Sequence, residues 1–502
     1  HSSIIYTVYL KFKVSEAVLS TFALMRTFII VLFVSSVTAL AAQSQGNTGD
    51  FKVLGLEECI QTAWSSNLNI KQAELGFESA ESQMLRTKAN VLPNLNGFAN
   101  HNYNWGQRID PFTNQFATTR VQSNTFGLST DITLFNGFQN LQNIRAQEAN
   151  LESSKYDLET QKNNIALSVS GAYLNILLSE ELIIAAEQQV VITQTQLERM
   201  KKLVAAGSAN LGNQYELEAQ LGRDKSNLTQ RTNEYNLAKL QLKQFLLIPA
   251  DEKIELVKPK ELNVEEQNMI ENATTIFGYA QGSMPEIRSA EFSLLSAEKQ
   301  TEVSKGGWYP TLSLSGSIGT GYSGLRTEVV SVKESGVQQI GFTDIGGRVF
   351  APTYETEMKR VGFGTQLSDN FNQFVGLSLN VPIFNRFAVN NNVQQSKINQ
   401  SIAEIQLEQE KLGLRQRIES ARADALAARD AYTGASESVK ANQKAFDFAQ
   451  ARFEAGALNV TEFNNSKNNL LIAQSQLLRS KYDYVFKVKV LDFYMGKPLA
   501  LN

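Results

Sequence analysis

Two long stretches of this sequence contain no proline, and each repeats a mainly apolar position at every seventh residue. The proline-free windows are residues 112–248 and 383–497. Proline breaks helix interiors, so its absence over such lengths predicts long helices. A sustained heptad favours helices that supercoil side by side with a left-handed twist. The heptad positions are Ile144, Leu151, Leu158, Ile165 and Ala172 in the first window, and Val393, Gln400, Leu407, Leu414 and Ala421 in the second.

The length of the first window constrains how its helix can pack. Residues from about 140 to 205 alone would form about 100 Å of helix at 1.5 Å per residue. Because that length exceeds the diameter of a globular domain, we expect the helices to bury their seams in an extended coiled assembly. The periodicity leaves one alternative open, in which several shorter helices form a globular bundle.

The two windows belong to a tandem repeat. Pro93 and Pro310 lie in similar segments and are 217 positions apart. Further along the chain, the separation of matching residues is 249 positions: Phe135-Asn136 matches Phe384-Asn385, Ala206-Gly207 matches Ala455-Gly456, and Pro249 matches Pro498. Several ordered matches at two constant offsets predict two homologous halves, residues 43–278 and 279–502. The second half then carries 32 extra residues between its two strand-like segments.

The start of the chain is typical of a protein that is exported. Residues 1–24 precede the first methionine and are interpreted as upstream sequence that is not part of the fold. Residues 25–42 have the features of a secretory signal peptide: Arg26, an apolar stretch from Phe28, and the small-residue pattern Ala39-Leu-Ala41. The alternative is a buried N-terminal helix. The single cysteine, Cys59, lies away from the expected cleavage site, so we predict no lipoprotein anchor.

Short segments with a period of two flank the predicted helices. Residues 126–134, 312–318 and 375–383 alternate apolar with small or polar residues, whereas Leu95–Tyr103 alternates poorly. Transmembrane barrel strands of about ten residues have this pattern, and so do half-buried strands of a soluble sheet. Export, together with the lack of any further run of 18 apolar residues, favours a barrel, because only helices and closed barrels span membranes.

Four strands per chain are too few for such a barrel. The smallest transmembrane barrels have eight strands. We therefore expect the chain to form a homotrimer, in which cyclic symmetry closes one shared sheet of twelve strands together with the helical layer. The predicted fold class is an α+β membrane protein. A long coiled-coil α-helical barrel and a 12-stranded transmembrane β-barrel arise from two tandem helix-strand-strand-helix-helix repeats.

Taken together, these features resemble the TolC-type outer-membrane efflux channel family. The resemblance covers about residues 51–502 and depends on the tandem halves and on three paired motifs. The paired motifs are Leu92-Pro-Asn-Leu95 with Tyr309-Pro-Thr-Leu312, Leu134-Phe-Asn-Gly137 with Ile383-Phe-Asn-Arg386, and Ala205-Ala-Gly-Ser208 with Glu454-Ala-Gly-Ala457.

The resemblance implies a trimeric channel in the bacterial outer membrane, continued by a helical tunnel through the periplasm. Such a channel is the exit duct of a tripartite efflux or type I secretion system, and its implied partners are a periplasmic adaptor, an inner-membrane transporter and outer-membrane lipid. Conduction would be passive and gated at the periplasmic helix tips. The loops at about 104–124 and 321–373 would face outside, where insertions are tolerated.

The resemblance also implies two sets of site residues. Acidic side chains six and nine residues after the second tip glycine narrow the entrance in the family; here these positions are Glu462 and Asn465, with Asn213 and Glu216 as first-half counterparts. One acidic and one neutral residue would make a weaker charged ring than the family pattern. Alternatively, Glu462 is simply a solvated helix residue. The implied adaptor contacts are the tip residues Ala206, Gly207, Ser208, Ala455, Gly456 and Ala457.

Composition narrows the remaining classes of function. Lys plus Arg total 47 and Asp plus Glu 50, so the chain lacks the basic footprint of a nucleic-acid-binding protein. One cysteine and two histidines leave little for metal or histidine-based chemistry, and we predict no enzyme activity, no cofactor and no metal site. The main alternative function is an exported, elongated coiled-coil periplasmic adaptor or structural protein. A secreted hydrolase is the enzyme-class alternative, and its sequence signature is absent.

Overall fold

The computed structural model describes residues 52–258, apart from 111, 115 and 119, and residues 270–499. The predicted upstream segment 1–24 and signal peptide 25–42 lie outside the described residues. The chain divides into two units, and the described part of the smaller one comprises residues 52–54 and 251–255. Its strand β1 (Lys52–Leu54) pairs with β6 (Ile254–Leu256) in a two-stranded sheet. Every other element belongs to the larger unit.

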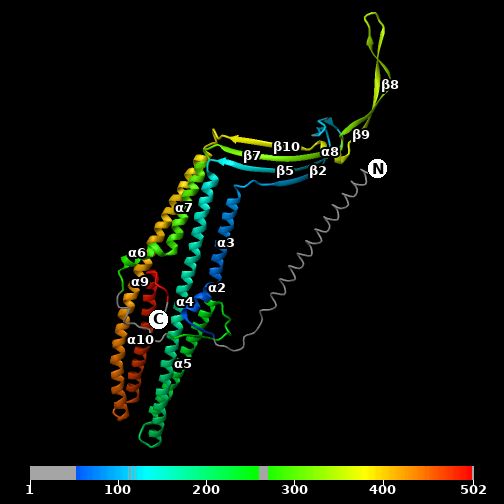
Figure 1. Cartoon of the computed structure of the whole chain (residues 1–502). Coiled ribbons are helices and arrows are strands. Elements are labelled where there is room, and N and C mark those ends of the chain that lie inside the picture. Colours follow the sequence, from blue (N-terminus) through cyan, green and yellow to red (C-terminus); the bar gives the residue numbers. More distant parts are fainter. Residues whose placement is uncertain (1–51, 111, 115, 119, 259–269, 500–502) are drawn as a thin grey trace, which may run out of the picture. The chain divides into compact units, whose positions relative to one another are not determined.

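In the larger unit, one order of elements occurs twice (Figure 1). A helix of 22 residues is followed by two strands, a helix of 67 residues and a helix of about half that length. The first series is α3 (Leu68–Ala89), β2 (Asn96–Asn104), β5 (Val121–Asn136), α4 (Gln139–Ala205) and α5 (Leu211–Leu246). The second is α7 (Pro285–Gly306), β7 (Thr311–Ser323), β10 (Asn372–Asn380), α9 (Ala388–Glu454) and α10 (Val460–Tyr494). Helices α2 (Leu56–Ser66) and α6 (Ala273–Ser283) precede α3 and α7.

The two long helices are continuous, as the proline-free windows predict. Helices α4 and α9 each contain 67 residues, which corresponds to about 100 Å. The alternative of several shorter helices is therefore wrong. Heptad residues such as Ile165, Leu407 and Leu414 are buried. One 18-residue window of α4 is apolar enough, with mean hydropathy 1.4, to cross a membrane, but half of it is buried inside the protein, as in a core helix.

Helices pack in a defined order along the larger unit. Helix α3 packs against α4, α4 against α7, and α7 against α9. Helices α4 and α5 form one antiparallel pair, here called the first hairpin, and α9 and α10 form the second hairpin. A core of ten buried residues joins α6, α7, α9 and α10, and Leu414 and Ile418 of α9 are fully buried in it.

The central sheet has four antiparallel strands in the order β10-β7-β5-β2. The two strands of each series are therefore neighbours, and the two series meet where β5 pairs directly with β7. Each strand of the sheet is followed or preceded by one of the helices α3, α4, α7 and α9, and all four connections lie at the same end of the sheet because neighbouring strands are antiparallel. Within the described residues, the outer edges of β10 and β2 pair with no other strand.

The register gives this sheet one apolar and one polar face. Leu377 pairs with Leu314, which pairs with Ile132, so three apolar side chains share one face. In the adjacent row, Ser378 pairs with Ser313, which pairs with Thr133. Directly opposed residues of paired strands lie on the same side. The alternation predicted from the sequence is therefore present across three strands, and it is weak in β2, as expected.

The predicted alternation fails at Leu134. A register shift lies between Thr133 and Phe135, so Phe135 rather than Leu134 pairs with Leu312. Leu134 is the extra residue of a β-bulge, and such bulges bend a strand and increase its twist. The bulge occurs just before the chain turns from β5 into α4.

The turn from strand to long helix has the same geometry in both series. Two consecutive residues are left-handed, with φ of 66° and 64° at Gly137 and Phe138 and of 56° and 60° at Arg386 and Phe387. An aromatic pair closes each turn: ring centroids are 5.3 Å apart for Phe135 and Phe138 and 5.7 Å apart for Phe384 and Phe387. Glycine is required at 137 because a Cβ there would lie 2.3 Å from the backbone oxygen of Gly306.

The 32 extra residues of the second series form ordered structure in the loop between β7 and β10. Strands β8 (Thr327–Phe342) and β9 (Arg348–Arg360) make an antiparallel hairpin, which is followed by the short helix α8 (Phe363–Asp369). The first loop contains the small pair β3 (Arg108–Ile109) and β4 (Phe116–Ala117). The sequence predicted the position of the larger loop but not its conformation.

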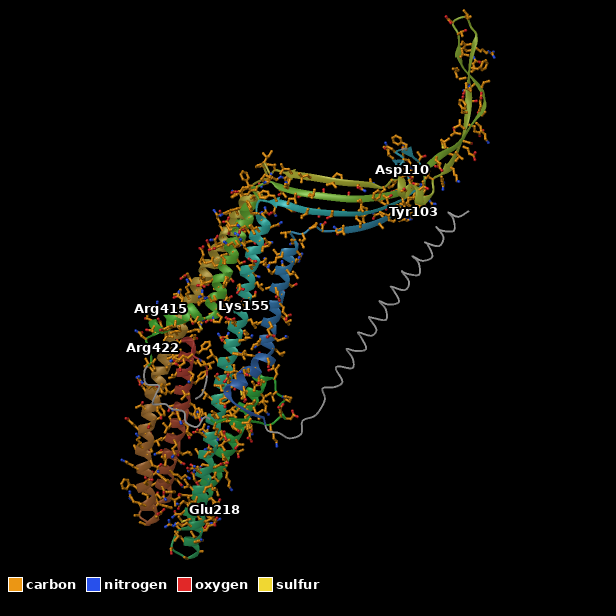
Figure 2. The ribbon with its side chains drawn as sticks, viewed as in Figure 1. Tyr103, Asp110, Lys155, Glu218, Arg415 and Arg422 are labelled. Atoms are coloured by element: carbon orange, nitrogen blue, oxygen red, sulfur yellow. The ribbon has the colours of Figure 1, made fainter. Side chains whose placement is uncertain are left out.

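A buried carboxylate joins the two loops. Asp110, labelled in Figure 2, is fully buried. It accepts hydrogen bonds from the Ser323 hydroxyl at 2.5 Å and from the backbone N–H groups of Phe112 and Thr113 at 2.9 Å. Burial raises the pKa of this carboxyl, but these hydrogen bonds outweigh the effect of burial and hold the pKa below its ordinary value of 3.8.

We expect the contact between the loops to weaken in acid. A lowered pKa means that the ionised carboxylate stabilises the contact fully above pH 3.8 and that this contribution is lost as pH falls through the lowered pKa. Pepsin should therefore cut the loop between β2 and β5 faster at pH 2 than at pH 4. In Asp110→Asn the cut should already be fast at pH 4. Equal rates in the two proteins at both pH values would contradict the prediction.

Candidate functional site

The turns that join the two helices of each hairpin are built alike. Gly207 has φ of 71° and Gly456 has φ of 78°, in the left-handed region that favours glycine. In the first turn the N–H of Ser208 donates to the carbonyl of Leu203 at 2.8 Å, and in the second the N–H of Ala457 donates to the carbonyl of Arg452 at 2.8 Å. This pattern is the Schellman motif, which satisfies carbonyl groups at a helix C-terminus.

The second helix of each hairpin also begins in the same way. The side chain of Asn210 accepts a hydrogen bond from the N–H of Gly212 at 2.9 Å, and that of Asn459 accepts one from Glu462 at 2.7 Å. Asparagine is a preferred N-cap because it satisfies one of the free N–H groups of the first turn. The six predicted tip residues are all exposed: Ala206, Gly207, Ser208, Ala455, Gly456 and Ala457. A Cβ added to either tip glycine would meet open space, so the φ angle alone selects glycine there.

The two tips lie beside each other. The guanidinium of Arg199, near the end of α4, donates to the backbone carbonyl of Glu454 at 3.2 Å. The hydroxyl of Thr461 on α10 donates to the carboxylate of Glu216 on α5, also at 3.2 Å. Val460 of α10 is buried against Leu217 and other residues of the first hairpin.

Of the four predicted gate residues, the structure brings two into direct proximity. Glu216 accepts a hydrogen bond from Thr461, the residue that precedes Glu462; Glu462 lies in the first turn of α10, whereas Glu216 lies just beyond the first turn of α5. Within the described part of the chain, the side chains of Asn213 and Asn465 make no hydrogen bond. Glu216, Glu462 and Asn465 are exposed and Asn213 is half-buried. These side chains could concentrate cations at an entrance, but nothing in the subunit fixes them as a ring.

Aromatic packing holds the second hairpin together near its tip. Phe453 of α9 stacks on Phe463 of α10 with ring centroids 4.6 Å apart, and the ring centroid of Phe446 lies 5.8 Å from that of Phe463. Such pairs contribute about 0.5–1.5 kcal/mol each beyond the area they bury. The α9–α10 contact is therefore strongly apolar at this level.

A buried ion pair, which the sequence did not predict, crosses from one hairpin to the other. The Lys467 ammonium on α10 lies 3.1 Å from the carboxylate of Asp224 on α5, and both side chains are almost completely buried, at 2% and 6% exposed. The ammonium also donates to the Thr193 hydroxyl of α4, and that hydroxyl donates to Asp224. Burial lowers the pKa of Lys467, although the Asp224 carboxylate acts in the opposite direction.

Further from the tips, a second polar contact links the hairpins. The Tyr482 hydroxyl of α10 donates to the carboxylate of Glu181 on α4 at 2.7 Å. Burial, reinforced by Glu181, raises the pKa of this phenol, which stays neutral at any physiological pH. The hairpins are therefore joined by polar contacts at several levels.

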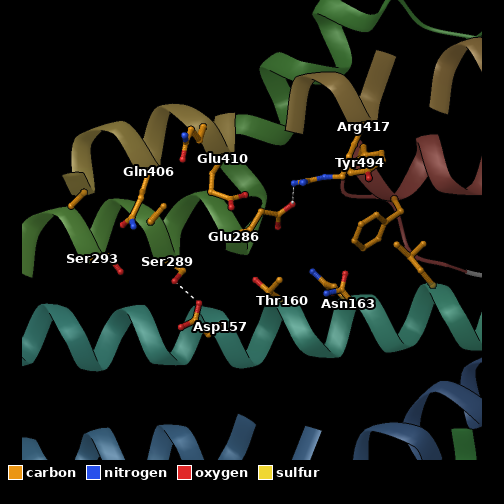
Figure 3. Close-up of a pocket in the computed structure, with 16 residues that line it drawn as sticks. Asp157, Thr160, Asn163, Glu286, Ser289, Ser293, Gln406, Glu410, Arg417 and Tyr494 are labelled. Carbon is orange, nitrogen blue, oxygen red and sulfur yellow. Dashed lines mark hydrogen bonds and ion pairs between the residues drawn. The ribbon is translucent and has the colours of Figure 1, made fainter. Parts of the chain in front are cut away.

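A cleft of about 620 Å³ opens where α7 begins and α10 ends, between α4 and α9 (Figure 3). The Ser289 hydroxyl donates to Asp157 at 2.5 Å, and Arg417 pairs with Glu286 at 3.2 Å across one side of it. In the described part of the chain, no group of three His, Cys, Asp or Glu residues is arranged to hold a metal ion. The cleft is a polar gap in the helical layer, in which Glu286 and Arg417 pair with each other and Asp157 binds Ser289.

Both halves of the chain are similar to known outer-membrane efflux proteins. The family model described as "Outer membrane efflux protein" matches residues 59–246 and 278–497, which is one match to each predicted half. The chain is 20% identical over 464 residues to the outer membrane efflux protein BepC of Brucella suis, covering 91% of this chain and 86% of the relative. It is 23% identical over 437 residues to the outer membrane protein TolC of Escherichia coli K12, covering 86% and 80%.

Solved structures share the fold at still lower identity. A crystal structure of CusC matches with a TM-score of 0.70 and 17% identity, and covers 91% of this chain and 96% of its own. The outer-membrane channel OprN matches with the same TM-score and 16% identity, covering 89% and 90%. The likeness extends across both hairpins and the sheet, since so little of either chain is left uncovered.

Proposed function

The chain belongs to the outer membrane efflux protein family, and from that premise we propose how it builds its channel: three copies join edge to edge around one pore. Its function is that of an outer-membrane efflux channel. The alternative of a soluble periplasmic adaptor is not favoured, because the family match includes both repeats. The proposal rests mainly on one observation, the four-stranded sheet whose two outer edges pair with no other strand among the residues that the structure describes.

In the proposed trimer, the outer edge of β10 in one copy pairs with the outer edge of β2 in the next. Both strands contain nine residues, so their lengths match. Unpaired N–H and C=O groups cannot remain in lipid, so an open four-stranded sheet has to close before it can span a membrane. Twelve strands close into a barrel with the apolar face of Leu377, Leu314 and Ile132 toward lipid and the serine-rich face toward the pore.

The layer of helices α3, α4, α7 and α9 exposes apolar side chains on its two outer helices, which the same assembly would cover. Four large apolar residues of α9 lie on one stripe and are 46–65% exposed: Ile398, Ile402, Ile405 and Leu412. At the other end of the layer, α3 exposes Leu68, Leu75 and Leu85. On α9, the spacings of four, three and seven residues place these side chains on one helix face. Packing α9 of one copy against α3 of the next would cover both sets and continue the layer around a tunnel.

The repeats, the tips and the partners complete the proposal. After removal of the signal peptide, residues 43–278 and 279–502 form the two halves of the duct. The adaptor meets the exposed tip residues around Gly207 and Gly456, and an inner-membrane transporter supplies the energy, so conduction through this chain is passive. Relatives include the cation efflux system protein CusC and the toluene efflux pump protein TtgC, so the exported substrate differs among similar channels.

Reconstitution of the purified protein tests the proposal directly. Electron microscopy of detergent-purified protein should show a threefold tube that narrows at one end, and planar lipid bilayers should show discrete current steps. The measurement needs no partner protein, because conduction is passive. A stable water-soluble monomer that carries no current would overturn the proposal.

We further expect Glu462→Ala to raise the single-channel conductance. The carboxylate projects from the exposed first turn of α10, and its removal shortens the side chain that narrows the entrance and loosens the closed state. The N-cap is retained, because Asn459 accepts its bond from the backbone of residue 462. Glu218→Ala, close to the first tip in Figure 2, removes an equal charge and serves as the control. An unchanged current in Glu462→Ala would count against a gate at this position.

A further inference from the structure

The contact between the two hairpins differs in chemistry from the contacts within them. Inside the first hairpin, Leu197 and Met200 of α4 pack on Leu217 and Leu221 of α5. Inside the second, Phe446 and Phe453 of α9 pack on Phe463 and Leu470 of α10. From the opposite hairpin, Val460 of α10 is buried in the first cluster and Phe453 of α9 packs against it. Each hairpin is thus held together by apolar packing.

Further along, the contact between the hairpins is polar, because the Lys467 ammonium of α10 binds Thr193 of α4 and Asp224 of α5. On α4, Gln189 and Gln196 lie about one turn before and after Thr193, so all three are on one face. On α10, Asn464 precedes Lys467 by three residues. We call Gln189, Thr193, Gln196, Asp224, Asn464 and Lys467 the polar seam; each is at least nine-tenths buried.

The polar seam is incompletely satisfied. The Nε2 of Gln189, the Oε1 of Gln196 and the Oδ1 of Asn464 are buried and have no hydrogen-bond partner among the described residues. These are three of the five such atoms in the described part of the chain, so the deficit is concentrated here. Each unpaired buried polar atom costs on the order of 1–3 kcal/mol. The closed seam is therefore less stable than an apolar seam of the same size.

The ion pair in the seam also makes the closed state less stable than apolar packing would. Removing two charges from water costs several kcal/mol per ion, and the attraction between them offsets this only in part, so a buried pair is often no better than apolar side chains. Gln220 supports the pair by donating to the Asp224 carboxylate at 2.7 Å. If the hairpins separate, both charges and the three unpartnered amide atoms become hydrated. The polar seam thus lowers the free energy required for separation.

From this geometry we infer that the polar seam is the joint at which the hairpins part, with the Lys467–Asp224 pair as the positioning contact of the closed state. The inference rests on the proposed function, because it takes gating at the periplasmic helix tips to require that the two hairpins separate there. Lys467 lies five residues after Glu462, or about 7.5 Å of helix, and it is buried whereas Glu462 is exposed, so the ion pair is distinct from the predicted gate carboxylate.

Two variants should change gating in opposite directions. Lys467→Ala leaves the Asp224 carboxylate buried without its cation, which destabilises the closed state only, so the open-to-closed ratio should rise by about tenfold or more. Lys467→Met combined with Asp224→Leu makes the seam apolar, so opening would expose hydrocarbon and the ratio should fall by about tenfold. The ratio is measured as dwell times of single channels in planar bilayers.

Controls separate gating from folding and from the proposed function. Lys201→Ala removes an exposed lysine that pairs with Glu198 within α4 at 3.1 Å, and it should leave the ratio unchanged. The exchange Lys467→Asp with Asp224→Lys keeps a pair and should return the ratio toward wild type, which also covers the case that Lys467→Ala fails to assemble.

The outcomes are distinguishable. A purely structural role would lower the yield of assembled protein in both variants and would not shift the dwell times in opposite directions. The inference would be overturned if the open-to-closed ratio changed in the same direction in both variants, or if it did not change in Lys467→Met with Asp224→Leu while wild-type channels conduct. Either result would leave the proposed function intact. Absence of current in the wild-type protein would instead remove the proposed function.

Discussion

Replacing Leu377 with arginine is expected to remove most of the assembled channel from the outer membrane. Leu377 lies in the middle of β10, is 65% exposed in the subunit, and shares the apolar face of the sheet with Leu314 and Ile132. An arginine on the lipid face of a barrel costs about 2–4 kcal/mol near the bilayer midplane. A trimer would carry this cost three times. Trimers that resist dissociation in detergent, quantified from outer-membrane fractions, should fall by about tenfold or more.

The adjacent residue supplies a matched control. Ser378 follows Leu377 directly, so its side chain points to the opposite face and pairs with Ser313. Arginine at this position would face the pore, so Ser378→Arg should assemble at near wild-type levels and lower the conductance. If the two variants had equal yields and equal currents, the assignment of the two faces would be wrong.

Loss of the Leu414 side chain should have the largest effect on subunit stability. Leu414 is fully buried where α9 meets α6, α7 and α10. Leu→Ala at such a site leaves a cavity and typically costs about 2–5 kcal/mol. The unfolding midpoint of the detergent-solubilised protein, measured by thermal denaturation with circular dichroism, should fall clearly.

A second leucine on the same helix distinguishes folding from assembly. Leu412 is 65% exposed and belongs to the stripe proposed to meet the neighbouring copy. Leu412→Ala should leave the stability of the dissociated subunit within about 0.5 kcal/mol of wild type, yet weaken the trimer. Equal destabilisation of the dissociated subunit by the two substitutions would contradict the burial pattern of α9.

The long helices and most strands could be predicted from the sequence because their signals are local and repeated. A window without proline, together with the heptad through Ile165 and Leu414, is sufficient to predict α4 and α9 as continuous helices. The alternation around Leu314 and Leu377 likewise predicts two-faced strands. Duplication strengthened both predictions, since each pattern occurs twice in the same order.

Other features depend on geometry that no short pattern encodes. The bulge at Leu134 is visible only from the pairing of Phe135 with Leu312. The hairpin of β8 and β9 lies in residues that have no counterpart in the first series, so the repeat could not inform it. The left-handed turns that end at Phe138 and Phe387 could have been predicted as a pair, because the same aromatic residue ends both turns.

The candidate site was predictable at the tips but not in the polar seam. The glycine turns are local, and the structure has both in the left-handed conformation. Lys467 stands seven residues after the buried Val460, a spacing that could have indicated a charged residue at an inward heptad position. Its partner Asp224 is 243 positions away, and no periodicity identifies that pairing. Whether Glu462 and Asn465 form a gate is still a prediction.

The outer edges of β2 and β10, which pair with no other strand in the described part of the chain, have a consequence for the newly made subunit. Between export and assembly, each copy presents the free backbone groups of β2 and β10 on either side of an apolar surface. Exposed edges of this kind are templates for indiscriminate strand addition, which leads to aggregates. Biogenesis is thus a competition between correct partnering and misassociation, and a periplasmic chaperone that shields these edges would raise the yield without contributing anything to the finished pore.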